Sequence, residues 1–364
     1  MRILYVTTVS VTMGFFEKHF QMLQKEGHTV ELACNCEQPL PQFCTEMGLK
    51  TYPIPFSRSP YSRTNLKALK VLTRVIDEGQ YDIVHTHTPT ASVCVRLVCR
   101  KFRKQGLKVF YTAHGFHFYK GAPLKNWLLY YPVEWICAHW TDVLITINHE
   151  DFERAERFLK AGIIRYIPGV GIDLDKFANR SVDRTVKKQE LGIPQDAVLL
   201  LSVGELNENK NHETVIKAIR DMDVYYCIAG QGDREDDLKK LAFELEIGSR
   251  VKLLGYREDV RELYQAADVF VFPSYREGLS VSLMEAMASG LPCAVSQIRG
   301  NTDLIDENGG ALFDPHNEGQ VIRALRTVLN GDRRMMGEYN RRKVKRFGAV
   351  EVIRQLKEIY DNVN

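Results

Sequence analysis

Two acidic residues stand eight positions apart in the segment PSYREGLSVSLMEAMASGLP, which begins at Pro273. The segment is predicted to run from the end of a strand through a turn into a helix that opens near Leu279. Glu277 then lies in the turn, and Glu285 lies two turns into the helix. If the start of the helix points at a cleft, both carboxylates can face that cleft.

The start of this helix is a candidate anion site, because the first backbone N–H groups of a helix have no partner within it. A simpler interpretation is that Glu277 interacts with the helix dipole and that Glu285 is solvated. However, Glu285 lies within the apolar run 283–288, where a carboxylate without a function would be costly. The expected anion donors are the N–H groups of Leu279, Ser280 and Val281.

The elements around this segment follow an α/β pattern. Short apolar runs rich in β-branched residues alternate with longer amphipathic segments, as in parallel sheets covered by helices. The pattern occurs twice, which favours two Rossmann-like domains that face one another, with ligands beyond the carboxyl ends of the strands. We predict a first domain over 1–175, a linker over 176–189, a second domain over 190–345 and a C-terminal helix within 346–364.

The predicted strands are short and regularly spaced. In the first domain they are ILYVTTV, HTVELAC, DIVHTHT, KVFYTAH and DVLITIN, and in the second AVLLLSVG, VYYCIAG, RVKLLG, DVFVFPS and PCAVS. Helical spacing is found over 15–26, 65–78 and 351–361.

Composition describes an ordinary folded protein of 364 residues, long enough for two cores. Its 45% hydrophobic and 26% charged residues argue against disorder and against a membrane bundle. A formal net charge of +3 gives no reason to expect nucleic-acid binding. The eight cysteines form no CxxC pair and no zinc-like cluster with histidine. No secretory signal or membrane span is predicted, so we expect the protein in the cytoplasm.

Other motifs accompany the acidic pair. They are SVGELNENKNHETVIKAI, IAGQGD, LLGYREDVRELYQAADVFVFPS, TAHGFHFYKGAP and IPGVGIDLDKF. Together with the spacing of Glu277 and Glu285, they resemble the family 4 retaining glycosyltransferases, which have the two-domain GT-B fold. The resemblance covers nearly the whole chain, and it implies a C-terminal helix that packs back on the first domain.

The resemblance implies roles for individual residues. Glu285 would hydrogen-bond the ribose hydroxyls of a nucleotide sugar, and Glu277 would contact hydroxyls of the donor sugar. Lys210 would place a fixed positive charge on the pyrophosphate, where negative charge develops as the nucleoside diphosphate departs. His114 would lie beside the anomeric carbon. Further contacts to the substrates are expected from Gly14, Gly204, Gly278, Leu279 and Ser280.

One position departs from the family pattern. The residue after Gly204, commonly arginine in the family, is Glu205. The usual second cation at the phosphates is therefore in question. Arg276 and Arg299 are the candidates to replace it.

Weaker features of the sequence offer alternatives. His117 competes with His114, and Gly14 stands alone where the family often has two adjacent glycines. The sequence Asp173-Leu-Asp175 spells a DxD, by which other glycosyltransferases bind a divalent cation, but the resemblance assigns it to the hinge region and we expect no metal there. The pair Gly230-Gln-Gly232 lacks the third glycine and the chain-start βαβ context of a dinucleotide site.

A basic and an aromatic stretch of the first domain bear on the acceptor. A basic face beside exposed Trp and Tyr of the run WLLYYPVEW would suit docking on an anionic bilayer without spanning it. The alternative is a solvated charged helix next to a buried aromatic one. The basic residues are Arg96, Arg100, Lys101, Arg103, Lys104, Lys108, Lys120 and Lys125.

The resemblance implies a metal-independent retaining transfer of a hexosyl or N-acetylhexosaminyl group, with a UDP-sugar as co-substrate and no cofactor. The form HGFHFYKGAPLKNW looks most like bacterial enzymes of capsule, exopolysaccharide and lipid-linked glycan assembly, so we expect a glycan acceptor on a polyprenyl diphosphate at the inner face of the cell membrane. The alternatives are a GDP-mannose-dependent transferase with a soluble or phospholipid acceptor, a nucleotide-sugar epimerase of the same architecture, and a catalytically inactive sugar-binding protein.

Overall fold

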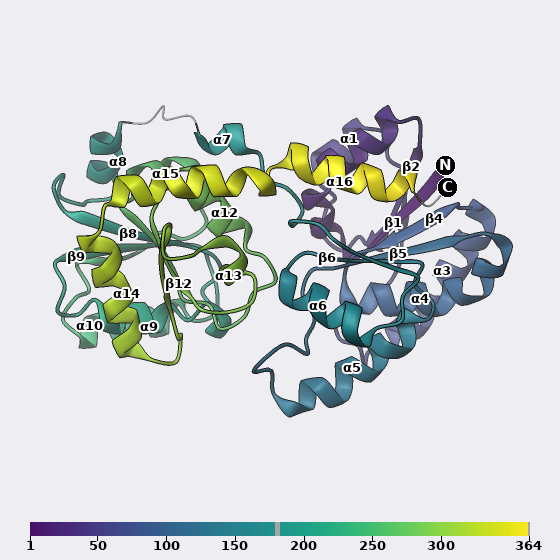
Figure 1. Ribbon diagram of the computed structural model, residues 1–364, viewed down its shortest axis with the longest axis horizontal. Helices are drawn as coiled ribbons and strands as arrows, with labels where there is room; N and C mark the ends of the chain where they lie inside the picture. Colours follow the sequence, from purple (N-terminus) through teal and green to yellow (C-terminus); the bar gives the residue numbers. More distant parts are fainter. Residues whose placement is uncertain (179–182, 363–364) are drawn as a thin grey trace. The chain divides into compact units, whose positions relative to one another are not determined.

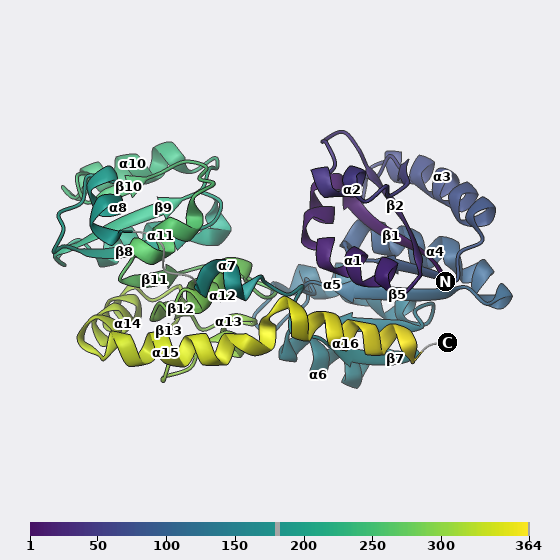
Figure 2. The same cartoon turned by 90° about the horizontal axis from the view of Figure 1, so that it is seen from above.

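The computed structural model describes residues 1–178 and 183–362. The chain forms two compact units (Figure 1). Unit 1 comprises Met1–Gly171 and the segment that begins at Ala349, and unit 2 comprises Ile172–Gly348. Each unit is a parallel β-sheet with helices on both faces, as the alternating pattern predicts (Figure 2).

The sheet of unit 1 has seven strands in the order β3-β2-β1-β4-β5-β6-β7, so the order reverses between β1 and β4. Alternate residues of β1 face opposite sides. Leu4 and Val6 pack with α3 and α4, whereas Tyr5 packs on Phe20 of α1. The strands are β1 (Arg2–Val9), β2 (Thr29–Asn35), β3 (Thr51–Pro53), β4 (Ile83–Thr86), β5 (Lys108–Ala113), β6 (Val143–Thr146) and β7 (Ile163–Tyr166). The α-helices are α1 (Glu17–Lys25), α2 (Gln42–Glu46), α3 (Thr64–Gly79), α4 (Pro89–Phe102), α5 (Leu124–Ala138), α6 (His149–Phe158) and α16 (Ala349–Asp361).

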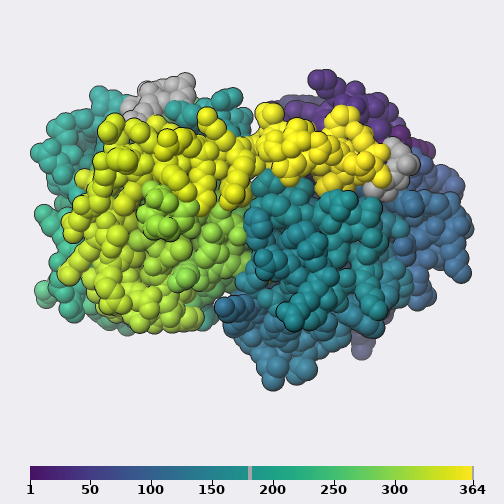
Figure 3. All heavy atoms as spheres, viewed as in Figure 1, coloured from purple at the N-terminus to yellow at the C-terminus, as the bar shows by residue number. Residues whose placement is uncertain are grey.

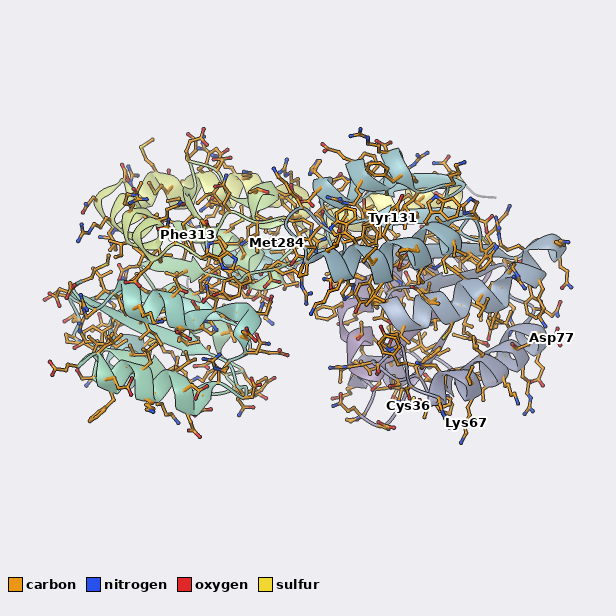
Figure 4. The ribbon with its side chains drawn as sticks, turned by 90° about the horizontal axis from the view of Figure 1, so that it is seen from below. Cys36, Lys67, Asp77, Tyr131, Met284 and Phe313 are labelled. Carbon is orange, nitrogen blue, oxygen red and sulfur yellow. The ribbon has the colours of Figure 1, made fainter. Side chains whose placement is uncertain are left out.

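The sheet of unit 2 has six strands in the order β10-β9-β8-β11-β12-β13 and reverses between β8 and β11. Met284 of α12 and Phe313 of β13, labelled in Figure 4, are both fully buried. The strands are β8 (Val198–Val203), β9 (Val224–Ala229), β10 (Val251–Leu253), β11 (Val269–Phe272), β12 (Cys293–Ser296) and β13 (Gly310–Phe313). The α-helices are α7 (Leu174–Ala178), α8 (Arg184–Glu190), α9 (His212–Ala218), α10 (Glu235–Glu244), α11 (Val260–Ala266), α12 (Val281–Ala288), α13 (Asn301–Leu304), α14 (Glu318–Asn330) and α15 (Arg333–Lys343).

All the predicted strands are present, with ends within two residues of those expected. The strands β3, β7 and β13 were not predicted, because each has only three or four residues and none shows clear alternation.

The segment 176–189, expected to be a linker, is in part helical. It contains the end of α7 and most of α8, and its residues 179–182 lie outside the described residues. The ammonium of Lys187 on α8 lies 2.8 Å from a carboxylate oxygen of Asp259 and 2.6 Å from one of Glu262. These ion pairs fasten α8 to the start of α11, so this part of the expected linker is built into unit 2.

The C-terminal helix α16 packs on unit 1, as the resemblance implies, and lies on its surface (Figure 3). It contacts α1. The buried Tyr360 near its end places its hydroxyl oxygen 2.6 Å from Nδ1 of His85 and 3.3 Å from the hydroxyl of Tyr5. Within the described residues, no helix is long and apolar enough to cross a membrane.

Candidate functional site

The loop that follows β8 carries Lys210 and is fixed by three asparagines. The side-chain oxygen of Asn207 accepts a hydrogen bond from the N–H of Lys210 at 3.1 Å. The amide groups of Asn209 and Asn211 donate to backbone carbonyls of the loop after β11, at 3.0 and 3.2 Å. The loops at the carboxyl ends of β8 and β11 are therefore tied together at the point where the strand order reverses, the usual binding place of open α/β sheets.

Lys210 and Glu277 meet at this point. The lysine ammonium lies 2.7 Å from a carboxylate oxygen of Glu277 and 4.8 Å from the ring centroid of Phe272. Both charged side chains are mostly shielded, with 19% and 15% of their surface exposed. Because water is partly excluded, the local dielectric constant is lower than in bulk water, and these charges interact more strongly with a charged ligand.

Glu285 occupies an apolar setting on α12. Burial raises the pKa of its carboxyl group to about 7, although a hydrogen bond from the hydroxyl of Tyr264, at 3.0 Å, favours the ionised form. Sequence reasoning recognised the cost of an idle carboxylate there but missed Tyr264, which comes from α11. A carboxyl group with this pKa changes its charge near neutral pH.

The turn before α12 differs slightly from the prediction. The helix begins at Val281, and Ser280 is its N-cap, with its hydroxyl oxygen accepting from the N–H of Leu283 at 3.3 Å. The expected start near Leu279 is therefore wrong by two residues, because a serine that caps a helix stands just outside it.

Of the two arginines expected to replace the usual second cation, Arg299 lies against the turn that carries Glu277. Its side chain is buried, and its Nε donates to the backbone carbonyl of Glu277 at 3.0 Å. Arg276 is exposed. Glu205 is also exposed, and its carboxylate accepts from the side chain of Asn207 at 2.7 Å.

The glycines of the Gly-Gln-Gly motif permit close packing of two strand ends. A Cβ added to Gly230 would lie 1.8 Å from the carbonyl oxygen of Gly204, and one added to Gly232 would lie 2.2 Å from that of Leu206. Both obstacles are backbone atoms, which are not free to move aside. The motif thus packs the exit of β9 against the loop that carries Lys210.

Replacing Gly230 with alanine should destabilise unit 2 by roughly 2 kcal/mol or more, because the loop after β8 must shift. Denaturant unfolding measures the effect. Gly248→Ala is the control, since the nearest atoms to a Cβ there belong to the backbone of Phe243, at an ordinary 3.9 Å. Equal stability of the two variants would contradict the prediction.

In unit 1, four histidines gather near the carboxyl ends of β1, β4 and β5. Nε2 of His114 lies 3.3 Å from Nδ1 of His87, and the ring of His87 lies 4.1 Å from that of His85. Burial lowers the pKa of His114 and of His19, on α1, to about 4, so both are neutral at pH 7. Sequence reasoning found His114 but missed the others. The alternation in HTHT, which puts His85 and His87 on one face, was the available indication.

The two remaining candidates of unit 1 are placed differently. The ring of His117 stacks on Tyr130 at 4.5 Å rather than on the histidine group. Gly14 is exposed in the turn after β1, and a Cβ there would meet the nearest atom, of Pro41, at an ordinary 3.7 Å. Packing within unit 1 therefore does not require glycine at this position.

The structure offers a local role for the DxD sequence. A carboxylate oxygen of Asp173 accepts a hydrogen bond from the N–H of Lys176, at 3.1 Å, in the first turn of α7. Across residues 1–178 and 183–362, no three His, Cys, Asp or Glu side chains are grouped so that they could hold a metal ion.

Part of the basic stretch is not on the surface. The side chain of Arg96 is 1% exposed, and its two terminal nitrogens lie 2.7 and 3.1 Å from the carboxylate oxygens of Glu134 on α5. Arg103 pairs with Asp142 at 2.8 Å. These two arginines therefore join elements of unit 1. For Arg96 the expectation of an exposed basic face is wrong, whereas the side chain of Arg103 keeps 27% of its surface exposed.

Comparison with known proteins identifies the class. The structure matches sucrose-phosphate synthase from Thermosynechococcus elongatus over 100% of this chain and 99% of that one, with a TM-score of 0.82 and 21% identity. It matches HepE from Anabaena, solved with UDP and glucose, over 100% of both chains, with a TM-score of 0.83 and 16% identity. The two sheets with their helices thus form the GT-B glycosyltransferase fold.

The sequence comparisons identify the family. The family described as "Glycosyltransferase Family 4" matches residues 19–176, and "Glycosyl transferases group 1" matches residues 183–343. The chain is 35% identical to "Putative glycosyltransferase EpsD" of Bacillus subtilis, over 99% of this chain and 96% of the relative. It is 30% identical to "UDP-Gal:alpha-D-GlcNAc-diphosphoundecaprenol alpha-1,3-galactosyltransferase" of Escherichia coli, over 94% and 91%. The protein belongs to the glycosyltransferases of family 4 and group 1.

Proposed function

We propose that the protein transfers a sugar from a UDP-sugar to a glycan carried on a polyprenyl diphosphate, with retention of anomeric configuration and without a metal. The observation that carries the proposal is the shielded pair of Lys210 and Glu277 at the reversal point of the unit 2 sheet, together with Glu285 on the following helix. The Escherichia coli relative, named for UDP-Gal and a diphosphoundecaprenol acceptor, supports the choice of substrates. The likeness to EpsD favours a place in bacterial surface polysaccharide synthesis.

The proposed chemistry assigns each group a task. Lys210, with Arg299 behind the turn, stabilises the negative charge that develops on the diphosphate as its bond to the anomeric carbon breaks. Glu277 holds hydroxyls of the donor sugar, and Glu285 holds the ribose. The acceptor hydroxyl forms the new bond on the same face of the sugar, and its proton passes to the departing phosphate. His114 remains neutral and positions the donor sugar.

Titration calorimetry with UDP and with GDP, each in the presence of EDTA, tests the donor site. Binding of UDP without metal is the expected result. Binding of GDP alone would replace the UDP-sugar with a GDP-sugar such as GDP-mannose. Binding of neither nucleotide would contradict the proposed donor site and would favour an inactive relative.

Nucleotide affinity should rise by about tenfold between pH 6 and pH 8, because only the ionised form of Glu285 accepts two ribose hydroxyls and its pKa is about 7. Calorimetry across this range measures the effect. Glu285→Gln is the control, since any pH dependence that it keeps belongs to the nucleotide phosphates. An identical pH profile in both proteins would refute the role of Glu285.

Replacing His114 with alanine should lower kcat by about 10²-fold and leave the affinity for UDP nearly unchanged, because the histidine positions the sugar and not the nucleotide. Initial rates of sugar transfer and calorimetry separate the two effects. His117→Ala, on the same loop, is the matched control and should keep most of the activity. A larger loss in that control would transfer the assignment to His117.

A further inference from the structure

Helix α5 presents an apolar face to solvent. Its inner side packs on unit 1, where the rings of Trp127 and Tyr131 contact the ring of Phe118. Tyr131 is labelled in Figure 4. Successive residues of an α-helix are about 100° apart, so the exposed apolar residues of α5 cover about half of the circumference of the helix. A surface helix normally places polar residues there. The exposed apolar residues of this outer face are Leu124, Leu128, Leu129, Val133, Trp135 and Ile136, which are between 40% and 73% exposed.

The helix that carries this face is firmly held. Glu134, on its inner side, binds the buried guanidinium of Arg96 through both carboxylate oxygens. The same guanidinium lies 4.3 Å from the ring centroid of Tyr111 on β5. The outer face is therefore a fixed feature of unit 1, at its periphery in Figure 1, and it does not result from loose packing.

Basic residues predominate in the chain segment that leads into α5 and includes its outer face. Residues 83–133 contain eight Lys or Arg and no Asp or Glu. Lys125 lies in the first turn of α5, and Arg100 of α4 lies 5.2 Å from the ring centroid of Trp140, just beyond the end of α5. A second copy of this chain would bring like charges together on such a face, whereas anionic lipid headgroups are complementary to them. The exposed basic residues of this stretch are Arg100, Lys101, Lys104, Lys108, Lys120 and Lys125.

We propose that the outer face of α5 inserts into the surface of an anionic bilayer and holds unit 1 on the membrane. The 15 residues of α5 extend roughly 22 Å, less than the roughly 30 Å of a hydrocarbon core, so the helix lies in the plane of the interface. The choice of a bilayer as partner rests in part on the proposed function, because a polyprenyl-linked acceptor resides in a membrane. The inserted residues are chiefly leucine and isoleucine together with Trp135, whereas Trp127 and Tyr131 pack inward.

Flotation of the full chain with vesicles tests this surface. The protein should float with vesicles that contain phosphatidylglycerol, more weakly with pure phosphatidylcholine, and less at high salt. The double variant Leu128→Ser/Leu129→Ser should bind at least roughly tenfold more weakly, since two exposed apolar side chains no longer insert. Phe243→Ser is the matched control, because Phe243 on α10 is 80% exposed and lies in unit 2. It should float like the unaltered protein.

The experiment distinguishes a wrong membrane proposal from a wrong assignment of the donor site. UDP binding by calorimetry should be the same in the double variant as in the unaltered protein, because the proposed donor site lies in unit 2. An unchanged circular-dichroism spectrum and unchanged thermal unfolding show that unit 1 of the variant is folded. Absence of flotation, or equal flotation of the double variant, would overturn the membrane proposal whether or not UDP binds. So would a dimer in light scattering that the double variant abolishes, because the face would then join two copies of the chain.

Discussion

Replacing Lys210 with methionine is expected to reduce kcat/KM for sugar transfer by about 10²–10³-fold. The ammonium stands at the joined ends of β8 and β11, and the proposed leaving group is a diphosphate whose charge increases as its bond breaks. Methionine keeps most of the apolar stem over Phe272 and removes only the charge. Steady-state rates with a UDP-sugar and a lipid-linked acceptor measure the loss.

Two further variants make this expectation specific. Lys217→Met removes an exposed ammonium on α9 that pairs with Glu213, and it should leave the rate within about twofold. The double variant Lys210→Met/Glu277→Gln also removes the negative charge of Glu277, which has no partner in Lys210→Met. If the double variant recovered most of the activity, the loss would come from an unpaired Glu277 and not from the missing cation.

Acid should unfold unit 1 well before general acid denaturation. The pKa of His19 is lowered from 6.5 to about 4 by burial, which corresponds to roughly 3 kcal/mol of the free energy of unfolding. The unfolded chain takes up this proton below pH 6.5, whereas the folded chain resists it down to about pH 4. The stabilisation is therefore complete above pH 6.5 and is lost as the pH falls. His85, His87 and His114 contribute in the same direction, because burial lowers each pKa.

Thermal unfolding between pH 7.5 and pH 4.5 measures this dependence. The melting temperature should fall steeply as the pH falls across this range. Unfolding of His19→Gln should take up about one proton fewer, so its melting temperature should depend less on pH. His139→Gln replaces an exposed histidine outside the group and is the control for the substitution itself. A melting temperature independent of pH would contradict the expectation.

The fold was largely predictable because short apolar strands, rich in β-branched residues, alternate with amphipathic segments in both units. The strands β1 and β8, which have eight and six residues and contain five apolar residues each, are clear in the sequence. The three-residue β3 is not, because its pairing with β2 depends on tertiary contacts. The helical nature of residues 184–190 was missed because a polar segment rich in Lys and Arg resembles a linker until the partners of Lys187 on another helix are known.

The site was predictable where spacing along one segment determines it, as for Glu277 and Glu285. It was not predictable where the partner comes from a distant part of the chain. Tyr264 reaches Glu285 from α11, and His87 reaches His114 from the end of β4. The three asparagines of the β8 loop were visible in the sequence, but each bonds to a different backbone group, and only the folded loop shows those partners.

The return of α16 to unit 1 has a consequence for biosynthesis. A ribosome must complete all of unit 2 before it makes the last element of unit 1. At typical elongation rates the delay is roughly 10–40 s. Throughout it, the side of the first sheet that Tyr360 later covers lacks its final helix, and His85 lacks its tyrosine partner. The nascent protein therefore keeps this side of the first sheet uncovered until the residues of α16 have been made.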